Sequence, residues 1–395
     1  MIKDGTHGSY NDLSEGIPLL SAKDIDNGKV IIPDDCRRIS LSDYNDIYKN
    51  YSLKINDILL TIVGTIGRVA LVSDITNKYA FQRSVGILRA NEYNNPQFIL
   101  YLLQTDFIKK QFYSKVNQSA QGGIYLDTLG KIDFKIPTLP EQEKIASFLT
   151  LIDKKIEKQK ELVELLKKYK RGLLSQIFSQ KLRFKDKNWN NYPDWEEKTL
   201  NNIFDIVTDF VAAGSFADLR KNVQYNEKPD FAQLVRTVDL KNNFKNKDFV
   251  FISESAYKYL WRVNLNEDAL ILPNIGANIG EVYYIYSFKL PYKNNVLGPN
   301  AILLKSSNNN LYYLYSRCLT DNFRKQLLLQ VGASGQPKFN KTDLKKIKIK
   351  ISININEQNK ISDFLSKFDD KIQQEKCILN YLQTYKKGLL QQMFI

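Results

Sequence analysis

The sequence predicts an α+β protein with an internal pseudo-twofold repeat: two strand-rich α/β modules separated by two long helices paired as an antiparallel coiled coil. Three observations predict this arrangement. One stretch of 38 residues occurs twice, and both copies place apolar residues at alternating steps of four and three. Each copy also follows a longer stretch that carries strand and turn signals.

The repeated stretch is a true duplication. Residues 141–178 read EQEKIASFLTLIDKKIEKQKELVELLKKYKRGLLSQIF, and residues 357–394 read EQNKISDFLSKFDDKIQQEKCILNYLQTYKKGLLQQMF. Without any gap, 18 of the 38 positions are identical. Unrelated segments of this length would agree at roughly two or three positions.

Both copies carry a heptad pattern, which is typical of helices that pair. Its apolar positions are Ile145, Leu149, Ile152, Ile156, Val163, Leu166, Leu173 and Ile177 in the first copy, and Ile361, Leu365, Phe368, Ile372, Leu379, Leu382, Leu389 and Met393 in the second. Polar residues interrupt the pattern at matching places, namely Gln159 and Lys170 against Glu375 and Lys386. Such interruptions fix the register of helix pairs. The alternative is two independent amphipathic helices, each lying on its own module.

Landmarks recur in the same order in the two modules. Each has a buried strand entering a turn bounded by glycines, a helical stretch, a polar loop and a final basic strand. These landmarks fall at 57–67, 97–103, 118–123 and 131–137 in the first module, and at 268–280, 311–317, 332–337 and 346–351 in the second.

The expected divisions of the chain follow from the repeat. They are a first module at 1–140, a central helix at 141–185, a second module at 186–351 and a C-terminal helix at 352–395. Nothing in the first half matches residues 179–210, so the first module is expected to be short at its N-terminal side.

The charge of the chain favours a polyanion such as nucleic acid as a partner. The formal net charge is +14, and the excess is +6 over residues 141–185 and +4 over residues 346–395. The modules are closer to neutral, with +1 over residues 1–140 and +3 over residues 186–345. The alternative is a soluble protein whose composition is simply rich in Lys and Asn.

Several function classes find no support in the sequence. The chain has one histidine, His7, and no GxxxxGK[ST] phosphate loop, so we expect no metal site, no catalytic triad and no ATP site. The acidic residues of Pro193–Lys198 lie too close together for a nuclease metal site. Long apolar runs and an apolar leader are absent, and three cysteines lie far apart, which together predict a cytoplasmic protein without a membrane span.

A binding function is better supported, because loop residues of both modules suit contacts to DNA. Arg and Lys can bond guanine, Asn and Gln can bond adenine, and hydroxyl groups can bond phosphate. The candidates are Thr6, His7, Ser9, Tyr10, Thr65, Arg68, Gln82, Arg83, Gln118, Ser119 and Gln121 in the first module, and Arg220, Lys221, Asn274, Asn278, Asn300, Ser334, Gln336 and Lys338 in the second. For any one of them, a solvated or turn-stabilising role is the alternative.

Three strings give the chain a resemblance to a known family. Ile136-Pro-Thr-Leu-Pro-Glu-Gln-Glu-Lys-Ile145 opens a helix, Lys170-Arg-Gly-Leu-Leu-Ser-Gln176 closes it, and Tyr192-Pro-Asp-Trp-Glu196 opens the next module. Together with the alternation of module and helix, they resemble the specificity subunit of type I restriction–modification enzymes. The chain departs from the pattern at Asn354–Gln358, which lacks both prolines, and in having the module opening only once.

The resemblance implies that the chain recognises DNA and catalyses no reaction itself. In that family each module reads one half of a split target in double-stranded DNA, and the helices separate the modules and dock two methyltransferase subunits. Restriction and translocation subunits complete the endonuclease. S-adenosylmethionine, ATP and magnesium then belong to the partner subunits, and this chain holds no cofactor. Two alternatives remain: a two-module scaffold that binds protein partners without nucleic acid, and a variant paired with a catalytic chain of another restriction type.

Overall fold

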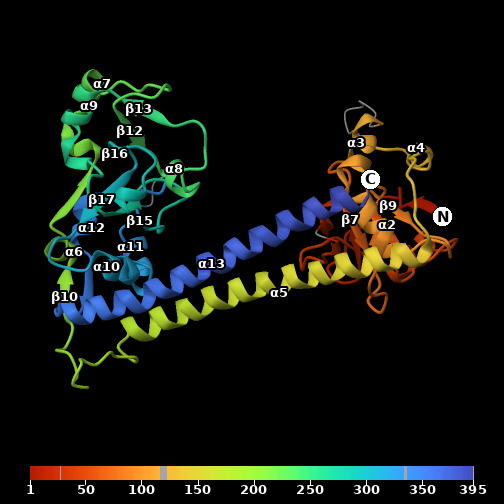
Figure 1. Cartoon of the computed structure of the whole chain (residues 1–395), viewed down its shortest axis with the longest axis horizontal. Helices are drawn as coiled ribbons and strands as arrows, with labels where there is room; N and C mark the ends of the chain where they lie inside the picture. Colours follow the sequence, from red (N-terminus) through yellow and green to blue (C-terminus); the bar gives the residue numbers. More distant parts are fainter. Residues whose placement is uncertain (27, 116–121, 333–335, 395) are drawn as a thin grey trace. The chain divides into compact units, whose positions relative to one another are not determined.

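The computed structural model describes residues 1–26, 28–115, 122–332 and 336–394 (Figure 1). The chain divides into two compact units. Unit 1 is Met1–Glu161 with Lys376–Ile395, and unit 2 is Leu162–Glu375. Each unit thus holds one module and part of both long helices, α5 (Leu139–Phe178) and α13 (Ile355–Met393). The four linear divisions expected from the sequence stay a prediction, because the units cut through both helices.

Unit 1 contains two small sheets. The first is antiparallel throughout, in the order β1 (Ile2–Asp4), β9 (Val85–Leu88), β6 (Ile58–Thr61), β7 (Val69–Leu71). In the second, β2 (Ile17–Leu20) pairs antiparallel with β5 (Arg38–Ile39) and parallel with β8 (Ala80–Phe81). The remaining elements are the hairpin β3 (Ile25–Asp26) and β4 (Lys29–Val30), and the helices α1 (Leu41–Ile47), α2 (Pro96–Leu103), α3 (Asp106–Ser114) and α4 (Leu126–Leu129).

Unit 2 repeats this topology. Its antiparallel sheet has the order β11 (Ile206–Asp209), β17 (Ala301–Lys305), β14 (Ala269–Pro273), β15 (Tyr283–Ile285). In its second sheet, β12 (Ala232–Val235) pairs antiparallel with β13 (Val250–Ile252) and parallel with β16 (Asn295–Leu297). The helices are α6 (Leu200–Ile203), α7 (Phe216–Asn222), α8 (Thr237–Lys241), α9 (Glu254–Tyr259), α10 (Leu311–Cys318), α11 (Asp321–Leu328) and α12 (Lys341–Lys346).

The central strands are continuous apolar runs because both of their faces are covered. On β14, Leu270 and Leu272 join a core with α10 and α11, while Ala269 and Ile271 join a second core with β12 and β16. The strand β6 is divided in the same way between two cores of unit 1.

Each long helix is anchored to its module by a buried glutamine in its first turns. Asn95 and Asn310 cap α2 and α10 by accepting a hydrogen bond from the third helical N–H. The backbone N–H of Asn95 donates to Gln142 Oε1 at 2.9 Å, and that of Asn310 donates to Gln358 Oε1 at 2.8 Å. The repeat therefore duplicates the attachment of helix to module as well as the helix.

The prediction of one strand is wrong. Residues 131–137 were predicted as the closing strand of the first module, but they form no strand, whereas their counterpart β18 (Lys348–Ile351) does. The partner of β18 is β10 (Glu196–Thr199), which precedes β11. In the first module β1 is the equivalent of β11, and no described residue corresponds to β10. An extended segment without a partner strand cannot form a ladder.

The ends of the two long helices meet within each unit. In unit 1, Leu149 near the start of α5 packs with Leu390 near the end of α13 and with Tyr101 of α2. In unit 2, Leu173 and Ile177 near the end of α5 share a core with Leu365 near the start of α13. All sixteen apolar heptad positions are buried or half-buried.

Candidate nucleic-acid interface

The same loops meet at one end of the four-stranded sheet in both modules. The N–H of Ile62, after β6, donates to the carbonyl of Ser84 at 2.9 Å, and the N–H of Asn274, after β14, donates to the carbonyl of Asn300 at 3.1 Å. Beside them, Val63 forms an isolated bridge with Gly123, as Ile275 does with Lys338. The loop after the buried strand, the loop before the last strand and the segment before α4 or α12 thus converge twice.

In the first module, one group of candidates surrounds the segment after β1. The Thr6 and Tyr10 hydroxyls lie 2.6 Å apart, and His7 Nε2 lies 2.6 Å from Asp4 Oδ2. Thr6 also forms an isolated bridge with Gln82 and accepts from the N–H of Arg83 at 2.9 Å. The structure therefore brings together Thr6, Tyr10, Gln82 and Arg83, with His7 and Ser9 exposed beside them.

Thr65 and Arg68 occupy the turn between β6 and β7. Gly64 and Gly67 adopt φ angles of +78° and +90°, which favour glycine. Thr61 Oγ1 accepts from the N–H of Arg68 at 2.9 Å and donates to the carbonyl of Thr65, so one buried hydroxyl holds the turn closed. Gln118, Ser119 and Gln121 lie outside the described residues.

The turn that carries Arg68 opens onto a basic cleft of about 560 Å³ within unit 1. Its basic lining residues are Lys29, Arg68, Lys109, Lys154, Lys160 and Lys386, against Asp26, Asp153 and Glu157. Lys29 is paired with Glu157 at 2.6 Å. The excess of positive charge suits the phosphate backbone of DNA.

In the second module, three of the eight candidates line a different cleft. This cleft holds about 650 Å³ and is lined by Arg220 of α7 together with Asn274 and Asn300. The Arg220 guanidinium makes no hydrogen bond or ion pair with any residue in the described ranges. Asn300 is exposed and has a φ of +68°. A guanidinium without a partner among the described residues, in a cleft that two asparagines also line, supplies donors and acceptors of the kind that read base edges.

The remaining candidates of the second module lie at several different places. Asn278 accepts from Lys241 Nζ at 3.2 Å, and Gln336 and Lys338 are exposed beside the turn at Gly276. Lys221 is exposed on α7 but does not line the cleft. Ser334 lies outside the described residues.

Sequence reasoning missed two aromatic residues of this cleft. Phe216 and Tyr225 line it and are 75% and 54% exposed. Exposed aromatic rings are suited to stacking on bases or packing on sugars. Nothing in the sequence separates them from core aromatics, although Ser215, the N-cap of α7 that precedes Phe216, marks a helix start at the surface.

A duplicated polar contact links the long helices and the modules. In unit 2, Lys170 Nζ of α5 pairs with Asp369 of α13, and the Tyr312 hydroxyl of α10 donates to the same carboxylate. Burial raises the pKa of Tyr312, and Asp369 raises it further, so the hydroxyl stays protonated as a donor.

Unit 1 repeats the contact with the same two positions of the repeat. Lys386 Nζ of α13 pairs with Asp153 of α5 at 2.6 Å, and the Tyr101 hydroxyl of α2 donates to Asp153 at 2.8 Å. Lys170 and Lys386 are the polar interruptions singled out in the heptad pattern, and each meets a carboxylate of the other helix.

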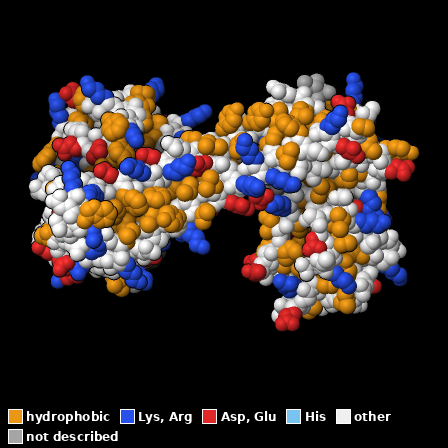
Figure 2. Space-filling view, turned by 60° about the horizontal axis from the view of Figure 1, so that its bottom comes forward, with side chains coloured by type: hydrophobic (Ala, Val, Ile, Leu, Met, Phe, Trp, Pro, Cys, Tyr) orange, Lys and Arg blue, Asp and Glu red, His pale blue; other side chains and the backbone are white. Residues whose placement is uncertain are grey.

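The charge of the surface is mixed. On the face drawn in Figure 2, Lys and Arg side chains are interspersed with acidic and apolar ones. Within the described ranges, no group of three or more His, Cys, Asp or Glu side chains is placed to hold a metal ion. No helix in that part of the chain is long and apolar enough to cross a membrane.

Comparison with known proteins decides the family. The family described as type I restriction modification DNA specificity domain matches residues 9–167 and, a second time, residues 192–384. The chain belongs to this specificity family. The two matches coincide with the two halves of the internal repeat, and the resemblance stated from the sequence is confirmed.

Relatives in the specificity family match this chain over different lengths. The putative type I restriction enzyme MjaX specificity subunit of Methanocaldococcus jannaschii is 25% identical over 99% of this chain and 89% of that protein. The MjaVIII specificity subunit of the same organism is 26% identical over 48% of this chain, a match that spans 45% of the relative. The crystal structure of a type I S subunit from M. genitalium aligns over 100% of this chain and 93% of its own, with a TM-score of 0.55 at 17% identity, and therefore shows the shared fold.

Proposed function

We propose that this chain is the DNA-reading subunit of a type I restriction–modification complex, and that each module contacts one half of a split target in double-stranded DNA. The observation that carries the proposal is the duplicated set of loops at the end of the four-stranded sheet. Candidate residues lie on equivalent loops in both modules, but their identities differ, as with Arg68 and Asn278 or Gln82 and Asn300. Two modules with one geometry and different side chains suit two different half-sites.

The chain itself performs no chemistry in this proposal. Two methyltransferase subunits, which bind S-adenosylmethionine, dock on the long helices, and restriction subunits that use ATP and magnesium join them in the cytoplasm. The positive charge of the helix segments is available both to acidic surfaces of these partners and to the DNA backbone.

We further propose that α5 and α13 pair as an antiparallel coiled coil along the predicted seam, related by a pseudo-twofold axis. The pairs Lys170–Asp369 and Lys386–Asp153 support this, because each joins the same two repeat positions in opposite helices. One antiparallel register satisfies both pairs. The helix pair then acts as a spacer between the half-sites.

Inserting one heptad after Glu161 and another after Cys377 is expected to lengthen the unread spacer of the target by about three base pairs. Seven helical residues add ~10.5 Å, which is close to three steps of 3.4 Å along DNA. Because these two points correspond in the repeat, both Lys–Asp pairs keep their register.

Methylation mapping in cells that express the variant with its methyltransferase subunit measures the spacer. An insertion in α5 alone is the control, since it moves one helix against the other. An unchanged spacer would refute the spacer role.

The function is tested by two measurements on the wild-type complex. Methylation mapping in cells should give a split target with a fixed spacer. Retention of the purified complex on duplex DNA carrying that target should fall steeply with salt, because several phosphate contacts release counterions. A complex without salt-sensitive DNA binding would instead indicate a scaffold for protein partners.

A further inference from the structure

Unit 2 has another cleft, which shares no lining residue with the cleft around Arg220. It holds about 560 Å³ and is lined by the end of α5, the ladder of β10 with β18, and the start of α11. None of the described candidates for DNA contact lines it. Four cations against two carboxylates leave the cleft a formal net charge of +2; these residues are Arg171, Arg317, Lys348 and Lys350, and Glu197 and Asp321.

The most deeply buried charge of this cleft is Arg317 of α10, which is 4% exposed. Its guanidinium donates to the Lys350 carbonyl at 3.2 Å, to Thr320 Oγ1 at 2.7 Å and to Asn322 Oδ1 at 3.1 Å. All three acceptors are neutral, and no carboxylate of the described residues forms an ion pair with Arg317. A guanidinium has five N–H donors, so these bonds leave two of them for a further acceptor.

The buried charge of Arg317 is not a requirement of the fold. Burial lowers the pKa of Arg317, because desolvation disfavours the charged form. In the first module, Leu102 of α2 takes its place, and Thr105 caps the following helix as Thr320 does in the second module. Leu102 is 3% exposed and belongs to an apolar core. The same helix pair therefore closes with a leucine, and the arginine adds a charge that nothing in its surroundings offsets.

The strand β18 adds two lysines to the same cleft. Lys348 and Lys350 alternate with buried isoleucines, so both project from the exposed face of the strand. Both lysines and Arg171 of α5 are exposed, and none of them forms an ion pair with a described residue. Together with Arg317, four positive groups without a carboxylate partner line one hollow.

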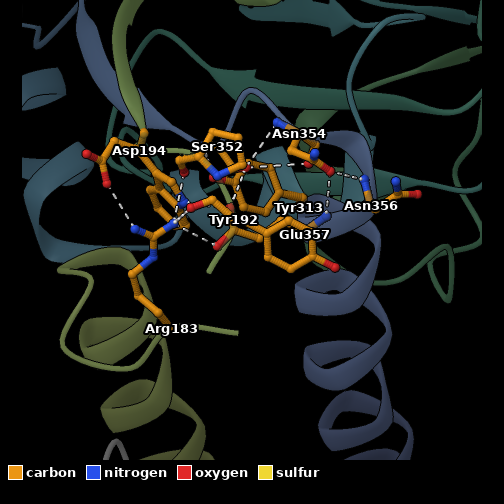
Figure 3. Close-up of polar contacts among 10 residues, drawn as sticks. Arg183, Tyr192, Asp194, Tyr313, Ser352, Asn354, Asn356 and Glu357 are labelled. Carbon is orange, nitrogen blue, oxygen red and sulfur yellow. Dashed lines mark hydrogen bonds and ion pairs between the residues drawn. The ribbon is translucent and has the colours of Figure 1, made fainter. Parts of the chain in front are cut away.

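The ladder that carries these lysines is held by a buried carboxylate of α13. Glu357 Oε2 accepts from Trp195 Nε1, just before β10, at 2.9 Å and from Ser352 Oγ, just after β18, at 2.6 Å. Figure 3 shows Arg183 reaching from the segment after α5 towards Glu357, beside Ser352. Both strands are thus tied at the same end of the ladder, and this wall of the cleft is formed before any ligand binds.

We infer that this cleft binds a phosphate group, either as inorganic phosphate or as the terminal phosphate of a small molecule. A phosphate monoester carries a charge of about −1.5 to −2 at neutral pH, which matches the net charge of the cleft, whereas each phosphodiester of DNA carries a single negative charge. The two remaining N–H groups of Arg317 bond the phosphate oxygens, and the lysines of β18 neutralise them further. Binding offsets the cost of burying the Arg317 charge. The site goes beyond the DNA-reading role and does not depend on it.

The test is calorimetric titration of the full-length chain with inorganic phosphate, in a buffer free of other oxyanions. We expect saturable binding of one phosphate per chain with a Kd below about 1 mM. Titration with adenosine 5′-monophosphate distinguishes the two sources of the phosphate group. A Kd at least about tenfold lower than that of inorganic phosphate identifies a nucleotide as the ligand, and an equal or higher Kd identifies free phosphate.

Four variants locate the site. Arg317→Leu installs the residue of the first module and should weaken phosphate binding at least about tenfold, because it removes the buried charge. Lys350→Gln changes an exposed side chain and should weaken binding several-fold without affecting the fold, whereas Glu197→Gln removes a repelling carboxylate and should strengthen it. Lys198→Gln is the matched control, since Lys198 lies on β10, pairs with Glu196 and does not line the cleft, and phosphate binding should not change.

Three results would overturn the proposal. The first is the absence of saturable phosphate binding by the wild-type chain. The second is wild-type affinity in both Arg317→Leu and Lys350→Gln, because the phosphate would then bind elsewhere. The third is displacement of phosphate by a blunt DNA duplex without terminal phosphates, because the cleft would then be part of the DNA interface.

Discussion

Replacing Trp195 by alanine is expected to lower the free energy of unfolding of unit 2 by about 3–5 kcal/mol, the range for removing a large aromatic side chain from a core. The indole is buried between Phe178 and Tyr313, so little space is recovered by relaxation. The substitution also removes a donor from the buried Glu357 carboxylate. Urea unfolding followed by amide hydrogen exchange measures the loss separately for the two units, which need not unfold together.

Two control variants separate packing from hydrogen bonding. Trp195→Phe keeps an aromatic ring but not the N–H, and its cost is expected to be about 1.5–3 kcal/mol, the value of a hydrogen bond to a charged group. Trp261→Phe changes a tryptophan that is 63% exposed and should stay within about 0.5 kcal/mol of wild type. Equal losses for Trp195→Ala and Trp261→Phe would contradict the account of the buried network.

The substitution Arg220→Ala is expected to weaken binding of the target by about 1–3 kcal/mol, a factor of roughly 5–150, and to relax discrimination in the half-site read by the second module. Arg220 is the basic side chain that lines this cleft together with Asn274 and Asn300, and it has no ion-pair partner among the described residues. The loss should therefore depend on sequence, because an arginine that bonds a base edge discriminates between bases.

Lys221→Ala is the matched control, since the residue lies next to Arg220 on α7 but outside the cleft. It should weaken binding to all sequences alike and reduce the salt dependence by about one phosphate contact. Binding to target duplexes with single changes in each half-site, measured for the complex with its methyltransferase subunits, distinguishes the two. If Arg220→Ala also lowered all affinities uniformly, Arg220 would be a phosphate contact and not a base-reading residue.

Local patterns in the sequence were sufficient to predict the duplication, both long helices and the main strands. The 3.6-residue periodicity of α5 and α13 and the apolar runs of β6 and β14 are properties of neighbouring residues, and burial on both faces explains why those runs do not alternate. The polar interruptions at Lys170 and Lys386 were also visible in the sequence. Their carboxylate partners were not, because Asp369 and Asp153 belong to the opposite helix.

Tertiary structure decided what depends on distant residues. It gathered Arg220, Asn274 and Asn300 around one cleft and left Phe216 exposed beside them, although composition alone would place a phenylalanine in a core. It also decided which of two similar segments forms a strand. Residues 131–137 and 346–351 both show a basic strand pattern, yet only the second became β18. A strand needs a partner to satisfy its backbone, and β10 supplies one only in the second module.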